Sequence, residues 1–435
     1  MQQPEFAEGD RIRLCKATEG GQVVYEGIVM PTASRHIVLK LDSGYNVGIR
    51  PDRVEIELIR RAGARKEQEP RKGEKERGDT IDKGLKQVPT IAILSTGGTI
   101  ASRVDYRTGA VSPQFSTEDL LEAIPELGAI ARIKGKVVYS ILSENMRAEY
   151  WRTLAQEVYT EIKNGAEGVI VTHGTDTMGY TAAALAFMLR TPVPIVLVGS
   201  QRSSDRPSSD ASMNAICAAT VACSDIAEVV VVMHGSTSDD FCLIHRGTKV
   251  RKMHTSARDA FHSINESPIG KLHYAASAIT NLRLEPLTSS YTRRGERDLE
   301  LHGELEEKCA LIKYYPGADP AILAYHVERG YRGIVLEGTG LGHVSAAWIP
   351  SVAETVNQGI PVVMTSQCLY GAICDRVYDT GRYLLQAGII EGEDMLPETA
   401  LVKLMWVLGQ TRDMEQIRAL MRTNLAGEIS GRRVP

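Results

Sequence analysis

Short uninterrupted runs of branched apolar residues alternate with helix-like stretches from residue 90 onward, and this alternation constrains the fold most. The runs are TIAIL, GVIV, PIVLV and EVVVV, which begin at residues 90, 168, 194 and 228. Helix-like stretches cover residues 150–163 and 180–189 between them. Strands that are apolar along their whole length are buried on both faces, as in parallel sheets covered by helices. The pattern predicts a mostly parallel α/β sheet.

A polar stretch around residues 291–303 separates this sheet from a smaller α/β unit. In that unit, GYRGIVLEG and GIPVVMTSQ are the evident strands. We therefore expect two α/β domains, at residues 89–290 and 300–435.

The first sixty residues instead indicate a small β structure. Strand-length runs rich in β-branched residues occupy residues 11–16, 23–30, 37–42 and 54–59, with glycine-containing turns between some of them. Closure would cover the exposed edges of such short strands, so we expect a small closed or half-open β-barrel domain at residues 1–59. Contact with RNA or protein and a role as an inert appendage are equally compatible with this pattern.

A charged linker is expected at residues 60–88. Residues 60–79 contain eight basic and five acidic side chains, so almost nothing there can be buried. A plain spacer is favoured over a basic tether for RNA.

Composition argues against several classes of function. The net charge of −4 and pI of about 6.2 make bulk attraction to nucleic acid weak. The seven cysteines form no C-x-x-C pair and the histidines no H-E-x-x-H, so neither a disulfide framework nor a metal site is predicted. No apolar run is long enough to span a bilayer, and the first residues lack a signal-peptide pattern. The expected location is the cytoplasm.

Two polar loops follow predicted strands where ligands bind in open α/β sheets. The first is TGGT at residues 96–99 and the second is THGTDT at residues 172–177. Neither G-x-G-x-x-G nor G-x-x-x-x-G-K-[ST] occurs, which argues against a nucleotide site. Each loop presents a threonine, whose hydroxyl needs a nearby base or cation before it can attack. A lysine oriented by an aspartate would meet that need.

TGGTI and THGTDTM resemble the two signatures of the asparaginase/glutaminase family. The stretches QRSSDRPSSDASMNA, GIVLEGTGLGHV and YGAICDRVYDTGR are also similar to that family, so the resemblance covers residue 90 to the end. It implies an asparaginase-like core of two α/β domains and an amidohydrolase that forms an acyl-enzyme. The catalytic residues implied by the resemblance are Thr99, Tyr106, Thr175, Asp176 and Lys252. Lys249, three residues before Lys252, is the competing lysine.

The same resemblance implies how an amino-acid substrate is held. Ser143 and Glu144 match the loop that binds its α-amino and α-carboxylate groups, and the carboxylate of Glu144 would favour an ammonium. Gly98 and Gly174 let the backbone approach the substrate and donate N–H groups to an oxyanion. His343 stands where bacterial relatives have an asparagine used across a subunit interface. No metal or cofactor is expected in this chain.

The ninety residues before the first loop are similar to the architecture of the D-subunit family of archaeal glutamyl-tRNA(Gln) amidotransferases. This resemblance implies that ammonia released from glutamine or asparagine passes to a partner E subunit, which uses ATP and Mg²⁺ and makes most tRNA(Gln) contacts. A homodimeric core, giving a heterotetramer with the partner, is also implied. The alternatives are a free-standing cytoplasmic L-asparaginase and a non-enzymatic adaptor, which the intact threonine, aspartate and lysine set disfavours.

Overall fold

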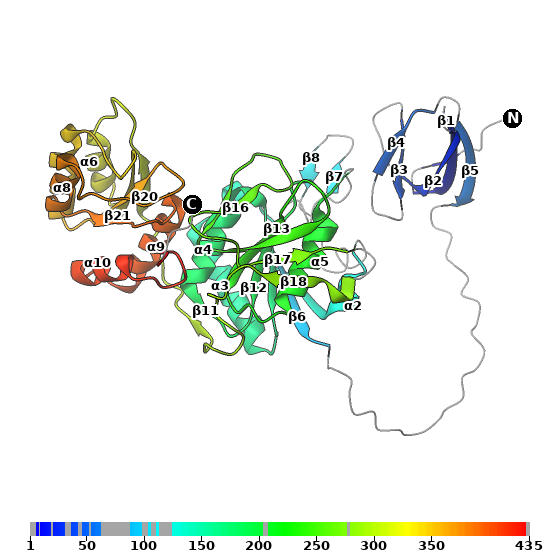
Figure 1. Cartoon of the computed structure of the whole chain (residues 1–435), viewed down its shortest axis with the longest axis horizontal. Helices are drawn as coiled ribbons and strands as arrows, with labels where there is room; N and C mark the ends of the chain where they lie inside the picture. Colours follow the sequence, from blue (N-terminus) through cyan, green and yellow to red (C-terminus); the bar gives the residue numbers. More distant parts are fainter. Residues whose placement is uncertain are drawn as a thin grey trace, which may run out of the picture.

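The computed structural model describes residues 6–7, 9–18, 21–30, 36–41, 46–51, 54–61, 88–97, 103–105, 110–112, 124–202, 208–275 and 279–431. Their elements form a small N-terminal sheet and two α/β units (Figure 1). Among the described residues, no helix has both the length and the apolarity to cross a membrane.

The N-terminal sheet has five antiparallel strands in the order β4-β3-β2-β1-β5. The four predicted strands are confirmed as β1, β2, β3 and β5, and β4 completes the sheet. Ile12, Leu14 and Leu39 are fully buried in its core. In the hydrogen-bonding order of the described strands, β4 and β5 stand at the two ends, which corresponds to the half-open form of the expected barrel. The bounds are β1 Arg11–Thr18, β2 Gly21–Met30, β3 Ile37–Leu41, β4 Asn46–Ile49 and β5 Val54–Arg60.

The first α/β unit is built on an eight-stranded sheet of order β18-β17-β14-β13-β12-β10-β6-β9. The four predicted strands are confirmed as β6, β10, β12 and β13, which with β9 form its parallel part. The remaining strands β14, β17 and β18 pair antiparallel with their neighbours. For β14, the link from β13 is too short for a crossover helix. The bounds are β6 Thr90–Ser95, β9 Arg132–Val137, β10 Val169–Thr172, β12 Ile195–Val198, β13 Val229–His234, β14 Phe241–Arg246, β17 Gly270–His273 and β18 Arg283–Pro286.

Helices cover both faces of the parallel strands. Along β10, Val169 and Val171 pack with α3 (Ala148–Lys163) and α4 (Met178–Met188), whereas Ile170 packs with α5 (Ala211–Ala222). This alternation explains why the strands are apolar along their whole length. The helices predicted at residues 150–163 and 180–189 are confirmed as α3 and α4, except that residue 189 lies in a short strand.

The second α/β unit is a four-stranded parallel sheet of order β20-β21-β22-β23. Helix α9 joins the two units, because Val402 and Met405 pack in the first core and Leu404 and Leu408 in the second (Figure 1). The two-unit α/β fold is therefore confirmed. The bounds are β20 Cys309–Lys313, β21 Gly333–Gly338, β22 Val362–Ser366, β23 Ile390–Glu391, α6 Ala321–Glu328, α7 Ile349–Asn357, α8 Asp379–Gln386, α9 Pro397–Gln410 and α10 Met414–Arg422.

Shorter elements complete the core. Within the described residues, two-stranded sheets pair β7 with β8, β11 with β19, and β15 with β16. The bounds are β7 Arg103–Asp105, β8 Ala110–Ser112, β11 Leu189–Arg190, β15 Val250–Lys252, β16 Phe261–Ser263, β19 Glu300–Leu301, α2 Leu127–Ile130, η2 Ser143–Asn145, η3 Thr175–Thr177, η4 Ile279–Asn281 and η5 Ala346–Trp348.

Candidate active site

The two threonine loops begin side by side because β6 and β10 are parallel neighbours, with Ser95 paired to Thr172. Thr96 Oγ1 donates to the Thr172 carbonyl over 2.9 Å, which links the loops. Gly97 has a φ of +103°, and a Cβ there would lie 2.5 Å from the Ile141 carbonyl oxygen, so glycine is required. Gly98, Thr99 and Tyr106 lie outside the described residues.

The second loop meets a lysine from a distant strand. Thr175 and Asp176 lie on η3, directly after β10, and Lys252 is the last residue of β15. Lys252 Nζ lies 2.9 Å from Thr175 Oγ1 and 2.7 Å from Asp176 Oδ1. At this distance Nζ can receive the hydroxyl proton or stabilise a developing alkoxide, while the Asp176 carboxylate orients it. The structure thus brings together three of the sequence-predicted residues.

Lys249, the competing lysine, points elsewhere. Its side chain is fully buried, and its Nζ lies 2.6 Å from Asp394 Oδ2 in the second α/β unit. Lys252 is instead the lysine at Thr175. Lys249 lies in the turn directly before β15 and Lys252 ends that strand, and their side chains contact different residues, Asp394 and Thr175.

The loop assigned to substrate binding packs against the same threonine loop. Ser143 is buried on η2, and its carbonyl accepts a hydrogen bond of 2.7 Å from Thr177 Oγ1. A Cβ at Gly174 would lie 2.7 Å from Ser143 Cβ, so only glycine permits this approach. Glu144 is exposed beside Ser143, where its carboxylate can meet a ligand from solvent.

A buried chain of hydrogen bonds holds the second threonine loop in place, and the sequence analysis did not predict it. His173 Nδ1 lies 2.7 Å from the Gly174 carbonyl and Nε2 lies 2.9 Å from Thr181 Oγ1, which also accepts from Trp151 Nε1. Burial lowers the pKa of His173 to about 4, so the ring is neutral at pH 7. A neutral ring donating from Nδ1 and accepting at Nε2 satisfies every partner. The sequence feature that could have indicated this role is the position of His173 within the THGTDT motif.

Two residues of the QRSSDRPSSDASMNA stretch, Asp210 and Asn214, also support the site. The sequence alone indicated no role for either of them. Asp210 is buried and accepts the backbone N–H groups of Gln201 and Arg202 at 2.9 to 3.0 Å. Asn214 donates to the Gly199 carbonyl over 3.0 Å. A Cβ at Gly199 would lie 3.0 Å from Thr175 Cγ2. The loop that begins at Gly199 therefore packs directly against the Thr175 side chain.

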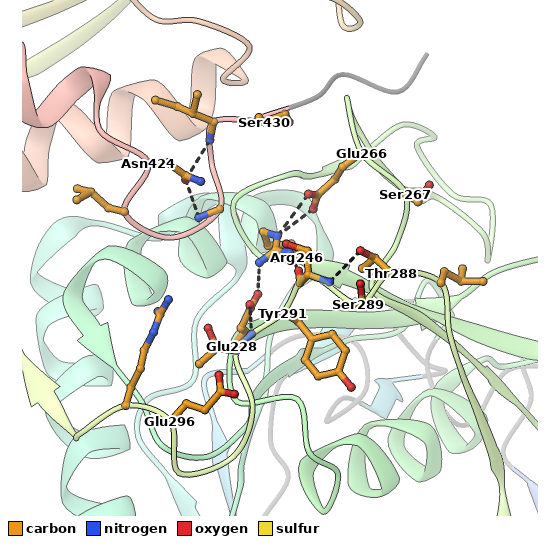
Figure 2. A pocket seen from close by; sticks show the side chains of 18 residues that line it. Glu228, Arg246, Glu266, Ser267, Thr288, Ser289, Tyr291, Glu296, Asn424 and Ser430 are labelled. Atoms are coloured by element: carbon orange, nitrogen blue, oxygen red, sulfur yellow. Dashed lines mark hydrogen bonds and ion pairs between the residues drawn. The ribbon is translucent and has the colours of Figure 1, made fainter.

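A polar cavity of about 820 Å³ lies apart from these residues, beside the C-terminal segment of residues 424–431 (Figure 2). Arg246 pairs there with Glu228 and Glu266 and donates to the Ser290 carbonyl. The charges of Arg246, Glu228 and Glu266 are therefore paired with one another. Neither Thr175 nor Lys252 lines this cavity.

The donor set at Thr175 points to acyl transfer. A threonine hydroxyl, an amine and a carboxylate in contact are the parts of an activated nucleophile. Within the described part of the chain, no group of three or more histidine, cysteine or acidic residues could hold a metal ion.

The half-buried His343 and the fully buried Asp375 face each other in the second α/β unit. Their side-chain nitrogens and oxygens are buried without a hydrogen-bond partner among the described residues, and His343 Nδ1 lies 4.0 Å from Asp375 Oδ1. Burial, with a smaller contribution from Glu391, raises the pKa of Asp375 to about 7.

An Asp375→Asn variant is expected to be more stable than the wild type, by a margin that grows as the pH rises, because the wild type loses stability when the buried carboxyl ionises. The folded carboxyl ionises near pH 7 and the unfolded one near pH 4, so the cost of ionising it is absent below pH 4 and complete above pH 7. We expect the advantage of Asp375→Asn over wild type in urea unfolding to be about 2.5 kcal/mol larger at pH 8 than at pH 5. Asp379→Asn, which removes the same charge from an exposed position, is the control. An equal advantage at both pH values would contradict the assignment.

The fold and the threonine, aspartate and lysine site together define an asparaginase-type amidohydrolase core. Family models agree: the asparaginase N-terminal domain matches residues 90–283, the glutaminase/asparaginase C-terminal domain matches residues 308–421, and the GatD N-terminal domain matches residues 6–59. The chain is 58% identical to the D subunit of glutamyl-tRNA(Gln) amidotransferase from Methanosarcina acetivorans, over 98% of this chain and 99% of that protein. It is 52% identical to the corresponding protein of Pyrococcus furiosus, over 99% and 96%.

The chain therefore belongs to the D-subunit family of glutamyl-tRNA(Gln) amidotransferases. Both resemblances predicted from its motifs and architecture are confirmed. Solved structures similar to the core include the thermostable L-asparaginase from Thermococcus kodakarensis, at 35% identity and a TM-score of 0.69 over 79% of this chain and 99% of that one. A probable cytoplasmic L-asparaginase from Campylobacter jejuni is 27% identical, with a TM-score of 0.63 over 77% and 100%.

Proposed function

We propose that this chain hydrolyses the side-chain amide of glutamine or asparagine and supplies the ammonia to a partner E subunit, which converts Glu-tRNA(Gln) to Gln-tRNA(Gln). The observation that carries the proposal is the placement of Lys252 Nζ at 2.9 Å from Thr175 Oγ1 and 2.7 Å from Asp176 Oδ1. A hydroxyl with an adjacent proton acceptor, itself oriented by a third group, is the arrangement of an activated nucleophile.

The reaction proceeds through an acyl-enzyme. A threonine hydroxyl, from Thr99 or Thr175, attacks the carboxamide carbon and loses its proton. The tetrahedral intermediate collapses, the amide nitrogen takes up a proton, and ammonia leaves. Water then attacks the ester carbonyl, the threonine oxygen leaves and takes back a proton, and the carboxylate product is released. Tyr106 is proposed to hydrogen-bond Thr99, and Lys252 with Asp176 to move the proton at Thr175.

The substrate's amino-acid end lies in the Ser143 loop in this proposal. The exposed Glu144 carboxylate pairs with the α-ammonium, and Ser143 contacts the α-carboxylate. Backbone N–H groups of the two glycine-containing loops, at Gly98 and Gly174, donate to the oxyanion. This arrangement selects a free amino acid, because both the α-ammonium and the α-carboxylate are recognised.

ATP, Mg²⁺ and most tRNA contacts are assigned to the partner in the cytoplasm, since the net charge of −4 gives this chain little bulk attraction for tRNA. A homodimeric core within a heterotetramer is proposed. It is supported by exposed tyrosines of the second α/β unit, since aromatic residues are enriched in protein interfaces. They are Tyr315, Tyr325, Tyr370, Tyr378 and Tyr383.

The proposal is tested by measuring ammonia release from glutamine and from asparagine, first by the chain alone and then with the E subunit and Glu-tRNA(Gln). We expect slow release alone, faster release in the complex, and formation of Gln-tRNA(Gln). Release at about ten per second by the isolated chain, unchanged by the partner, would instead identify a free-standing asparaginase.

A further inference from the structure

The strand that carries Lys252 touches both α/β units. Because side chains alternate along β15, Val250 and Lys252 face the first unit, where Val250 packs in the core and Lys252 reaches Thr175. Lys249 and Arg251 face the second unit and pair with its acidic residues. The strand that carries the reactive amine is therefore in contact with both units.

Lys249 provides the strongest of these attachments. Lys249 Nζ and Asp394 Oδ2 are 2.6 Å apart, and both side chains are fully buried. The second carboxylate oxygen, Asp394 Oδ1, accepts the backbone N–H of Ser430 at 3.0 Å. Burial opposes ionisation, but the Lys249 ammonium and the hydrogen bonds from Ser430 together outweigh it and hold the pKa of Asp394 below its usual value.

Neighbouring residues also attach the hairpin formed by β15 and β16 to the second α/β unit. Thr248 Oγ1 donates to the Ala426 carbonyl over 3.0 Å, and the Thr248 carbonyl accepts from Thr399 Oγ1 over 2.9 Å. Ala426 belongs to the C-terminal segment that lies beside Arg246 at the edge of the cavity (Figure 2). The backbone on the N-terminal side of β15 is thus fixed from two directions.

The partner strand β16 is held in the same way. Asn265, just after β16, donates from Nδ2 to the carbonyls of Asp394 and Gly371 at 3.1 and 3.0 Å, and its Oδ1 accepts the Gly371 N–H at 2.8 Å. Asp394 is therefore the common point at which both strands of the hairpin meet the second unit.

We propose that Lys249 is a positioning residue for the amidase reaction: its buried ion pair with Asp394 fixes β15 and so sets the distance between Lys252 Nζ and Thr175 Oγ1. This inference rests on the proposed function of Lys252. A displacement of about 1 Å in a reacting group can lower a rate about 100-fold, so a fixed strand matters to the chemistry. It also makes the catalytic geometry depend on the contact between the two α/β units.

The test separates positioning from fold stability. Lys249→Met alone leaves the Asp394 charge buried and unpaired, which destabilises the fold, whereas replacing both partners by apolar residues often restores stability. In the amidotransferase complex, we expect the Lys249→Met/Asp394→Leu variant to regain the wild-type Tm to within a few degrees. We expect its kcat for ammonia release to fall by about 10- to 100-fold, with KM changed by less than about twofold, since substrate-binding groups lie elsewhere.

Arg251→Met is the matched control, because it breaks a more exposed ion pair with Glu398 from the same face of the same strand. It should leave kcat unchanged. Asn265→Ala, which keeps every charge, is the second variant and should show the same split between kcat and KM to a smaller extent. Wild-type kcat in a folded double variant, or in Asn265→Ala, would overturn the proposal.

A crystal structure of the double variant decides the inference independently of activity. Lys252 Nζ should lie beyond hydrogen-bonding distance of Thr175 Oγ1, and an unchanged distance overturns the positioning role. If the wild-type complex released no ammonia from either amide, the proposed function would fail, while this distance would still report on Lys249.

Discussion

Replacing Thr175 with alanine is expected to lower kcat for ammonia release from glutamine by about 10⁴-fold. The variant removes the hydroxyl that Lys252 Nζ contacts at 2.9 Å, so neither direct attack nor proton relay can pass through this position. The loss should affect kcat and kcat/KM equally, because Ser143 and Glu144 remain to hold the amino-acid end of the substrate. Steady-state ammonia release with glutamine and with asparagine measures it.

Two comparisons make the Thr175→Ala result specific. Thr153→Ala removes a hydroxyl from the exposed face of α3 and should retain wild-type activity. With added ammonium salt, the Thr175→Ala complex should again form Gln-tRNA(Gln), provided that size-exclusion chromatography shows the partner still bound. Glutamine hydrolysis within about tenfold of wild type would remove Thr175 from the mechanism.

Six of the parallel strands and the loops that follow them were predictable from sequence because their information is local, whereas the parallel edge strands β9, β20 and β23 were not predicted. In β10 the continuous apolar run reports burial on both faces, and the polar residues that follow it mark the strand's carboxyl end. The strands β14, β17 and β18 were not predicted. Phe241 and Leu243 on β14 are only partly buried and alternate with the buried Cys242 and Ile244, so β14 is less uniformly apolar than β13.

The site was predictable only as far as its motifs extend. Thr175 and Asp176 stand together in one loop, whereas choosing Lys252 over Lys249 requires knowing that the intervening residues are extended. Asp394, which forms the ion pair with Lys249, lies 145 residues away in the sequence and belongs to no recognised motif. His173 was visible within THGTDT, but its role depends on Thr181 and Trp151, which only the packing of α3 against α4 brings together.

Replacing Lys252 with methionine is expected to lower kcat by about 10³-fold, within the range for losing a proton-transfer group. Methionine keeps much of the side chain's length but provides neither a proton acceptor nor a charge. Lys252→Arg distinguishes these two roles. Arginine retains the charge beside Asp176 but cannot accept the threonine proton, so a variant as impaired as Lys252→Met indicates proton transfer.

The size of the effect separates chemistry from folding at this position. Asp176 is 66% exposed, so its ion pair with Lys252 contributes at most about 1 kcal/mol to stability. A 10³-fold loss of kcat corresponds to about 4 kcal/mol in the activation free energy. Lys252→Met should therefore shift the urea midpoint only slightly while nearly abolishing ammonia release. If activity fell only in proportion to the folded fraction, Lys252 would be a structural residue, and proton transfer at Thr175 would have to be assigned to another group.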